Sequence, residues 1–392
     1  MPTMMEYVGR EELEHRWARV RRFMDCDALL VLQNVDQFYL SGTIQDGVLW
    51  FPREGEPVFA VRKSLTRATT ESPLKNIVPF KRFRELPSLI PTVAEVLGLE
   101  FDVLPVSVHQ QIAKAFPNAR FIDQSMAIRR ARAVKTPLEQ DHIRRAAAML
   151  DAAFLDIPGQ LREGMEEVEL GIRIEQVMRQ AGHQGLVRVR RFNMEMYFGA
   201  VSFGDTAAYP HSFDGAVGVR GLYPALPVMG GRKTLVRGEP VMVDIVGGHG
   251  GYLADASRAY SLGSPSSQVM ETHQFILELN SWMEEQLKPG NVPSQIYVET
   301  LNRLENTPYK PHFLGAAENQ VSFVAHGIGL ELDEIPVIAP RFDEPLEPGV
   351  VLAMEPKIFY PGVGGAGVEN TYIITDTGCE RLLSSPMEWI SV

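Results

Sequence analysis

Apolar residues recur at two different periods along this chain, and each period predicts a type of element. The apolar residues from Leu13 to Phe23 follow a helical spacing, so residues 10–25 are predicted to form an amphipathic helix. Short apolar runs with strand character follow, and another helical pattern lies among them. The predicted strands are 27–33, 38–42, 48–51, 57–62 and 102–106, and the predicted helix is 86–97. This alternation predicts an α/β domain that ends near Gln124.

The start of a long helix marks the beginning of a second domain. Thr136 is a typical N-cap residue, Pro137 suits the first helical position, and Glu139 completes a capping box. We place the boundary just before this helix. Residues 1–128 then form one domain and residues 129–392 form the other.

The second domain shows a coarse internal repeat. Two helical patterns precede a strand–turn–strand segment at 241–263, and two more precede a similar segment at 349–375. The four helical patterns are 137–157, 165–181, 266–287 and 294–305. We therefore expect two similar halves that face each other, each contributing one pair of strands to a shared centre.

The segment 241–263 carries two aspartates on apolar strands. Its glycines at 247, 248, 250 and 251 indicate a turn, since glycine tolerates positive φ. A hairpin centred on His249 and Gly250 places Asp244 opposite Asp255, with Cβ atoms roughly 4.5–5.5 Å apart. Two like charges at that distance destabilise the hairpin unless one carboxylate is protonated or a cation lies between them. The alternative is an offset turn in which both aspartates face water.

A second acidic pair and one histidine extend this pattern. Glu355 and Glu369 lie symmetrically about Gly362, so a second hairpin brings them together. His326 has glycines at the next and third positions, which allow the backbone to approach a site closely. Four carboxylates and one imidazole suit two adjacent divalent ions. The glycines of 362–367 fit G-x-G-x-x-G, but a strand pattern follows them, so we interpret them as a turn and not as a dinucleotide site.

The composition is typical of a two-domain globular protein and argues against some partners. The chain has 392 residues, 45% hydrophobic and 22% charged, with a net charge of −11. This charge argues against nucleic acid as a partner. Two cysteines are too few for a disulfide framework, charged residues appear early at the N-terminus, and no apolar run approaches the roughly 20 residues of a membrane span. We therefore expect a cytoplasmic protein without a membrane partner.

The acidic residues and the histidine resemble the metal-ligand set of the M24 metallopeptidases, which include prolidase, aminopeptidase P and methionine aminopeptidase. The match covers, in order, Asp244, Asp255, His326, Glu355 and Glu369. The part before residue 129 resembles, more loosely, the N-terminal domain of creatinase and prolidase. The resemblance implies an α/β N-terminal domain, a catalytic domain of the pita-bread fold with two pseudo-symmetric halves, and a homodimer. It also implies an exopeptidase of the Xaa-Pro dipeptidase or aminopeptidase type, which acts on small peptides with two Mn²⁺, Co²⁺ or Zn²⁺ ions.

The resemblance also assigns roles to the matched residues. Asp244 and Asp255 bind one ion and His326 and Glu355 bind the other, while Asp255 and Glu369 bridge the two. Two such ions lower the pKa of a bound water and polarise a carbonyl oxygen. Glu355 is in addition the catalytic residue that takes the proton of the nucleophile, which suits a carboxylate next to that water.

Histidines that the family places near its substrate are missing at the expected positions. Asp333 stands seven positions after the metal-binding histidine, where active peptidases usually have another histidine. Ser322 stands where prolidase-like members often have one. A third usually follows a proline shortly before the first aspartate ligand, where the nearest match here is Pro227. His211 also follows a proline, but it lies 33 residues before that ligand and returns to the site only if an insertion loops out.

Three residues are candidates for substrate binding: Asp333, His211 and Arg258. Arg258 matches the family's Asp-x-x-Arg and is either a partner of the carboxylate cluster or an exposed surface residue. An ionised Asp333 can only accept hydrogen bonds. It therefore pairs with a cation such as Arg258, is protonated through burial, or binds the free α-amine of a substrate.

Two questions stay open from the sequence. Residues 191–231 are rich in Phe, Tyr, Met and Gly, and they either line the substrate pocket or form a surface insertion. The missing histidines also leave room for two other functions. One is a different metal-assisted enzyme on the same fold, such as a lyase or a C–N hydrolase, and the other is a catalytically silent metal-binding homologue.

Overall fold

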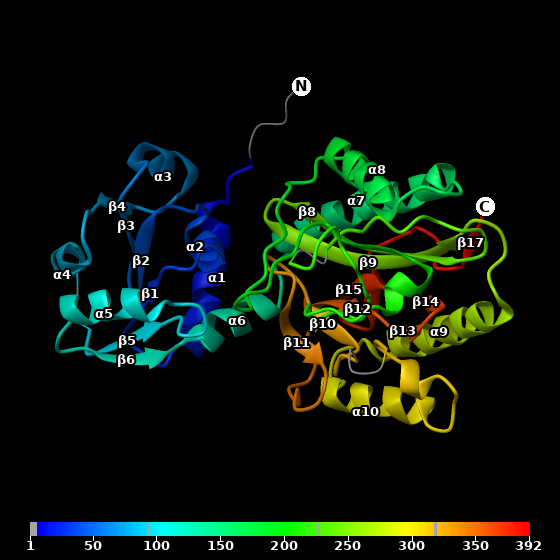
Figure 1. The fold of residues 1–392 in the computed structure, drawn as a ribbon. Coiled ribbons are helices and arrows are strands. Elements are labelled where there is room, and N and C mark those ends of the chain that lie inside the picture. Colours follow the sequence, from blue (N-terminus) through cyan, green and yellow to red (C-terminus); the bar gives the residue numbers. More distant parts are fainter. Residues whose placement is uncertain (1–5, 92–93, 226–227, 317–319) are drawn as a thin grey trace. The chain divides into compact units, whose positions relative to one another are not determined.

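The computed structural model describes residues 6–91, 94–225, 228–316 and 320–392. The chain divides into two compact units, residues 1–132 and 133–392. Each unit contains both helices and β-sheet (Figure 1). Within the described ranges, no helix is long and apolar enough to cross a membrane.

A six-stranded mixed sheet forms the centre of the first unit, in the order β4-β3-β2-β1-β5-β6. The pairs β1–β2 and β2–β3 are antiparallel, and the other three pairs are parallel. The strands are β1 (Ala28–Val31), β2 (Gly47–Pro52), β3 (Val58–Val61), β4 (Asn76–Pro79), β5 (Val96–Leu99) and β6 (Arg120–Asp123). The helices are α1 (Arg10–Phe23), α2 (Asn34–Ser41), α3 (Leu65–Glu71), α4 (Leu86–Leu89), α5 (Val106–Ala115) and α6 (Ser125–Ala133), with the 3₁₀ helix η1 (Phe83–Glu85).

Three of the elements predicted for this unit are wrong. The predicted strand 38–42 is the end of α2, because the Gln33 side chain caps the helix start and Gly42 ends the helix with a φ of 77°. The predicted helix 86–97 is the short α4 followed by β5, with residues 92 and 93 outside the described residues. Residues 102–106 form no strand and lead from a turn into α5. A short apolar run is compatible with either a helix or a strand. Helix caps and strand pairing in the sheet therefore determine which of the two forms.

The first half of the second unit packs two helices against a four-stranded sheet of the order β17-β9-β8-β7. Figure 1 shows α7 along the strands β8 and β9. The predicted capping box is confirmed, since Thr136 Oγ1 accepts from Glu139 N and Glu139 Oε2 accepts from Thr136 N. The elements are α7 (Pro137–Gln160), α8 (Glu167–Gln180), β7 (Gly199–Phe203), η2 (Gly204–Ala208), β8 (Pro240–His249), β9 (Tyr252–Ser261) and the C-terminal β17 (Ile390–Ser391).

The second half repeats this plan with a five-stranded sheet, β11-β10-β12-β15-β16, and a separate hairpin, β13–β14. Ile276 and Met283 of α9 lie in one hydrophobic core with Leu352 and Tyr372 of the sheet. The elements are α9 (Ser267–Gln286), α10 (Pro293–Leu304), η3 (Lys310–His312), β10 (Ala325–Gly327), β11 (Glu334–Ile338), β12 (Val351–Met354), β13 (Lys357–Tyr360), β14 (Gly364–Gly367), β15 (Asn370–Ile374) and β16 (Cys379–Arg381). The glycines predicted to form only a turn therefore also form β14.

A backbone pairing beside the acidic residues joins the two halves. Ser257 of β9 and Glu369, just before β15, exchange N–H···O bonds of 3.3 and 3.2 Å. The link falls on a predicted metal ligand, so the carboxylates of both halves meet where the halves are connected.

The first hairpin has a register different from the predicted one. Asp244 pairs with Ser257, and Asp255 pairs with Val246. The turn is formed by Gly250 and Gly251, both with positive φ (59° and 93°), as in the two-residue turns that match the twist of paired strands. The two aspartates are therefore diagonal neighbours on one face and not directly opposed, at the roughly 7–8 Å typical of such neighbours.

The second hairpin has the predicted register. Met354 pairs with Asn370 on one side of the acidic pair, and Lys357 pairs with Gly367 on the other. The same register on both sides places Glu355 and Glu369 across from each other. Each hairpin thus presents its two acidic side chains on one face, because directly opposed and diagonal residues of paired strands share a face.

Candidate metal centre

The five predicted metal ligands converge in one region of the second unit. They come from β8, β9, β10 and the two segments that flank the β13–β14 hairpin. Their ligand atoms form two groups, and within each group these atoms lie within 4.8 Å of one another. The groups are Asp255, His326 and Glu369, and Asp244, Glu355 and Glu369.

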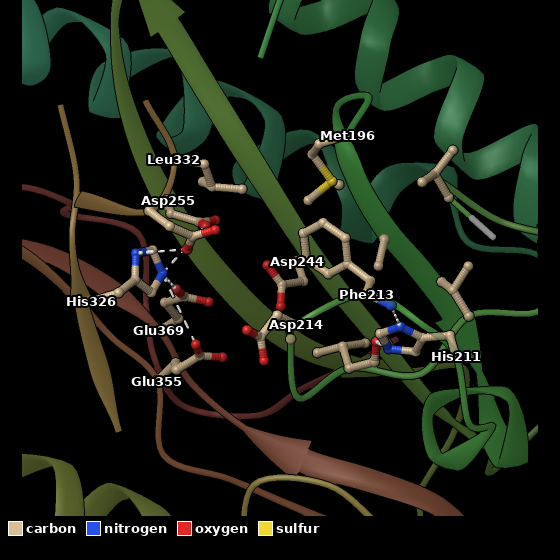
Figure 2. A pocket seen from close by; sticks show the side chains of 17 residues that line it. Met196, His211, Phe213, Asp214, Asp244, Asp255, His326, Leu332, Glu355 and Glu369 are labelled. Carbon is tan, nitrogen blue, oxygen red and sulfur yellow. Dashed lines mark hydrogen bonds and ion pairs between the residues drawn. The ribbon is translucent and has the colours of Figure 1, made fainter. Parts of the chain in front are cut away.

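The group of Asp255, His326 and Glu369 fits a divalent ion. His326 Nε2 lies 4.0 Å from Asp255 Oδ2 and 3.8 Å from Glu369 Oε1 (Figure 2). Two buried oxygens, Asp255 Oδ1 and Glu369 Oε1, have no hydrogen-bond partner among the described residues. Burial and the charges of Glu369 and Asp244 raise the pKa of Asp255 well above its ordinary value, and a cation there offsets both effects.

The orientation of His326 agrees with a divalent ion at this group. Its Nδ1 donates to the carbonyl oxygen of Gly327 at 3.1 Å, which leaves Nε2 as the lone-pair nitrogen that faces the carboxylates. The histidine is 5% exposed. Because the ring is fixed in this way, only its carboxylate-facing nitrogen is available to an ion.

The other group already contains a cation of the chain itself. Nζ of Lys357 donates to Asp244 Oδ2 at 2.7 Å, to Glu355 Oε2 at 2.7 Å and to Glu369 Oε2 at 2.6 Å. The side chain of Lys357 is fully buried. Burial lowers its pKa, but the three carboxylates raise it by more, so the pKa lies well above its ordinary value and the amine is an ammonium. The three oxygens of this group therefore do not fit a second ion while Lys357 stands there.

Sequence reasoning missed Lys357, although the chain carries a signal for it. Lys357 follows Glu355 by two positions in an extended segment, so both side chains point to the same face. A lysine in an otherwise apolar strand, on the face of a carboxylate cluster, is a candidate partner of that cluster. Its cross-strand neighbour is Gly367, where an added Cβ would lie 2.5 Å from Lys357 Cγ, so the glycine leaves room for the lysine stem.

Arg258 is buried behind the centre and does not line the pocket. Its Nη1 donates to the carbonyl oxygen of Glu369 at 2.8 Å, and its Nη2 donates to Asn370 Oδ1 at 2.8 Å. It is neither exposed nor paired with Asp333, so the prediction that it binds substrate is not supported. Its contact with Glu369 agrees with the alternative prediction, in which Arg258 is a partner of the carboxylate cluster.

Asp333 is close to the metal-binding histidine. Its Oδ1 lies 3.6 Å from His326 Nδ1, and 37% of its side chain is exposed to the pocket. Burial raises the pKa of Asp333, and the nearby His326 opposes this. The basic side chain beside Asp333 is therefore the imidazole of His326 and not the guanidinium of Arg258.

Part of the segment 191–231 lines the pocket, which is one of the two interpretations that the sequence left open. Met196, His211 and Phe213 line the same pocket as the carboxylates (Figure 2). His211 uses both ring nitrogens within its own loop, because Nε2 donates to Val217 O at 2.9 Å and Nδ1 accepts from Phe213 N at 3.0 Å. It therefore shapes the wall and does not face the carboxylates with a free nitrogen. Pro227, the other position considered, lies outside the described residues.

The family models agree with this architecture. The model of the metallopeptidase family M24 matches residues 141–376, and the model of the creatinase/prolidase N-terminal domain matches residues 16–134. The M24 match covers more than half of the chain, so the protein belongs to this family. The predicted combination of a creatinase-like α/β domain and an M24 catalytic domain is confirmed.

Named relatives are similar over nearly the full chain. The Xaa-Pro dipeptidase of Pyrococcus furiosus is 24% identical over 381 residues, which are 96% of this chain and 99% of the relative. An Xaa-Pro dipeptidase structure from Bacillus anthracis has a TM-score of 0.82 at 26% identity and covers 97% of this chain and 100% of its own. An X-Pro aminopeptidase structure from Thermotoga maritima has a TM-score of 0.80 at 25% identity, with coverages of 95% and 100%.

Proposed function

We propose that this protein is a metal-dependent hydrolase, an exopeptidase of the Xaa-Pro dipeptidase or aminopeptidase type. The observation that carries the proposal is the convergence of four carboxylates and His326 at one largely buried centre. The family and the named relatives, all peptidases, support it. They give no support to a lyase, a C–N hydrolase or a silent homologue.

Glu355 is the proposed proton-transfer residue. Its Oε2 accepts from Lys357 Nζ, and its Oε1 lies 4.0 Å from His326 Nε2. Because the ammonium holds Oε2, we assign to Oε1 the proton that leaves the attacking water and passes to the departing nitrogen. Burial raises the pKa of Glu355 against the opposing effect of Lys357, and a raised pKa favours such transfers near neutral pH. A divalent ion at the Asp255, His326 and Glu369 group supplies Lewis-acid polarisation of the scissile carbonyl.

The pocket beside the carboxylates suits a small peptide with a free α-amine. Its acidic residues outside the metal-ligand set are Asp214 and Asp333. Asp214 is paired with the guanidinium of Arg191 at 2.6 Å, whereas the basic neighbour of Asp333 is the imidazole of His326 at 3.6 Å. We therefore assign the substrate ammonium to Asp333. The apolar part of the wall, which suits the side chain and a proline ring, consists of Met196, Phe213, Val217, Val219, Val228 and Leu332.

A turnover screen tests the proposal. Chelator-treated protein reloaded with Mn²⁺, Co²⁺ or Zn²⁺ is incubated with Xaa-Pro dipeptides, longer Xaa-Pro peptides and non-peptide amides. We expect release of the N-terminal residue from Xaa-Pro substrates, and none from the Asp255→Asn variant. Turnover confined to non-peptide amides would favour the C–N hydrolase, and no turnover by a metal-loaded protein would favour a silent homologue.

Three finer expectations belong to the same proposal. The ion is Mn²⁺, Co²⁺ or Zn²⁺, which metal analysis of protein purified without added metal tests. The assembly is a homodimer, which light scattering tests. The location is the cytoplasm, as expected from the cysteine count, and cell fractionation tests it.

A further inference from the structure

We propose that the ammonium of Lys357 replaces one of the two cations that the family resemblance implies, so that each chain binds a single divalent ion. The inference rests on the proposed metal-dependent function and concerns the composition of the same site. Its basis is the position of Nζ, which lies 2.6–2.7 Å from one oxygen each of Asp244, Glu355 and Glu369.

Glu369 is oriented as a ligand shared between two cations. Its Oε2 accepts from Lys357 Nζ at 2.6 Å. Its Oε1 faces the other way, lies 3.8 Å from His326 Nε2 and has no hydrogen-bond partner among the described residues. One oxygen therefore serves the ammonium, and the other is free to bind an ion together with Asp255 and His326.

A second ion cannot share its oxygens with the ammonium. Oxygen ligands hold divalent ions at about 2.0–2.6 Å, so an ion among the same three oxygens would be in contact with Nζ. The lysine has little room to withdraw, because its side chain is fully buried. Its stem also lies against Gly367, whose ideal Cβ position is only 2.5 Å from Lys357 Cγ.

The metal content of the wild-type protein is the first test. Protein stripped with a chelator is reloaded with excess Mn²⁺, desalted and analysed by mass spectrometry of the metal and by electron paramagnetic resonance. We expect one Mn²⁺ per chain and the six-line spectrum of an isolated ion. Two ions per chain with an exchange-coupled spectrum would overturn the inference and leave the metal-dependent function standing. No binding of Mn²⁺, Co²⁺ or Zn²⁺ would overturn the proposed function itself.

The Lys357→Ala variant is the second test. Removal of the ammonium and its stem frees three oxygens, so we expect two Mn²⁺ per chain and a coupled spectrum. Lys233→Ala is the matched control, because Lys233 Nζ also contacts two carboxylates, those of Asp205 and Glu239, but does not contact the metal-ligand set. It should keep one ion. A folded Lys357→Ala protein that still binds only one ion would contradict the inference, and the wild-type count remains decisive if the variant does not fold.

Discussion

Arg258 donates a hydrogen bond of 2.8 Å to the backbone carbonyl of Glu369, the carboxylate shared by both ligand groups. The same guanidinium donates to Asn370 Oδ1 and to both Ser385 O and Ser385 Oγ. The residue is 2% exposed. Arg258 thus ties the backbone of the shared ligand to the C-terminal segment from behind the metal-binding face.

Loss of this contact should affect stability and metal binding together. We expect Arg258→Met to lower the free energy of unfolding by about 3 kcal/mol, because several buried acceptors lose a charged donor. Mn²⁺ affinity should fall roughly tenfold, as for an outer-shell partner. Chemical denaturation and calorimetric titration measure the two effects. Arg258→Lys is the control and should recover only part of the stability and of the Mn²⁺ affinity, since one ammonium does not span acceptors on four residues. Unchanged Mn²⁺ affinity in a folded Arg258→Met protein would leave only a structural role.

Substitutions of the two ligand groups should differ in their effect on metal affinity. Glu369→Gln and Asp255→Asn each remove an oxygen ligand from the group that fits an ion. Their Mn²⁺ affinity should fall by at least the roughly 10–100-fold that loss of an outer-shell partner costs. Asp244→Asn changes a residue whose Oδ2 is bonded to Lys357, so its affinity should fall less than tenfold. Equal losses in all three variants, measured by calorimetric titration, would make Asp244 a direct ligand and contradict a single-ion centre.

Asp333 should distinguish substrates by their N-terminus. If its carboxylate accepts from a free α-ammonium, Asp333→Ala removes a charged hydrogen bond, which is worth about 1.5–3 kcal/mol. We expect kcat/KM to fall roughly 10–100-fold for peptides with a free amine and far less for N-acetylated analogues. The same assay on His211→Gln is the control, because the His211 ring nitrogens are engaged in its own loop. Equal losses on free and blocked peptides would leave Asp333 as a neighbour of His326 only.

Protonation of His273 should weaken the fold in mild acid. This histidine is 2% exposed, its Nε2 donates to Met387 O at 2.9 Å, and its Nδ1 is buried without a partner in the described part of the chain. Burial therefore lowers its pKa below the ordinary value of 6.5. The imidazole of the unfolded chain binds a proton near pH 6.5, whereas the folded one does not. The free energy of unfolding therefore decreases as the pH falls below this value.

The pH dependence is measured against a variant that does not titrate. His273→Gln keeps an amide donor that can reach Met387 O. Between pH 7 and pH 5 the wild type should lose stability relative to this variant by up to about 1.4 kcal/mol per pH unit, the limit for one proton. Denaturation curves at several pH values check this. A difference between the two proteins that stays constant with pH would show that His273 does not titrate on unfolding.

Much of the centre followed from the sequence, because strand geometry is local. Residues placed symmetrically about a hairpin turn lie opposite each other on the two strands, so the positions of Glu355 and Glu369 on either side of Gly362 were enough to bring them together. The signal for the helix that starts after Thr136 was equally local, since a capping box lies within four residues. The ligand set Asp244, Asp255 and His326 came from a resemblance in residue type and order, which does not depend on knowing the fold.

Tertiary structure decided what local patterns leave open. The run 38–42 became the end of a helix, because short apolar segments have no decisive period. The register of the first hairpin was set by a turn at Gly250 and Gly251, whose positive φ values move its centre past the predicted His249 and Gly250. Each of these outcomes depends on caps or turn geometry that hydrophobic patterning does not encode.

The sequence by itself determined the class of side chains at the centre: four carboxylates, one histidine and the strands that carry them. Only the tertiary structure decided that Lys357 contacts three of these carboxylates at once. Lys357 meets Asp244 across 113 positions of the chain and Glu369 across 12. The contact with Asp244 arises only when two hairpins from different halves are brought face to face. The physical reason is that buried charges must be paired wherever the fold places them, and long-range pairing is a property of the fold and not of any one segment.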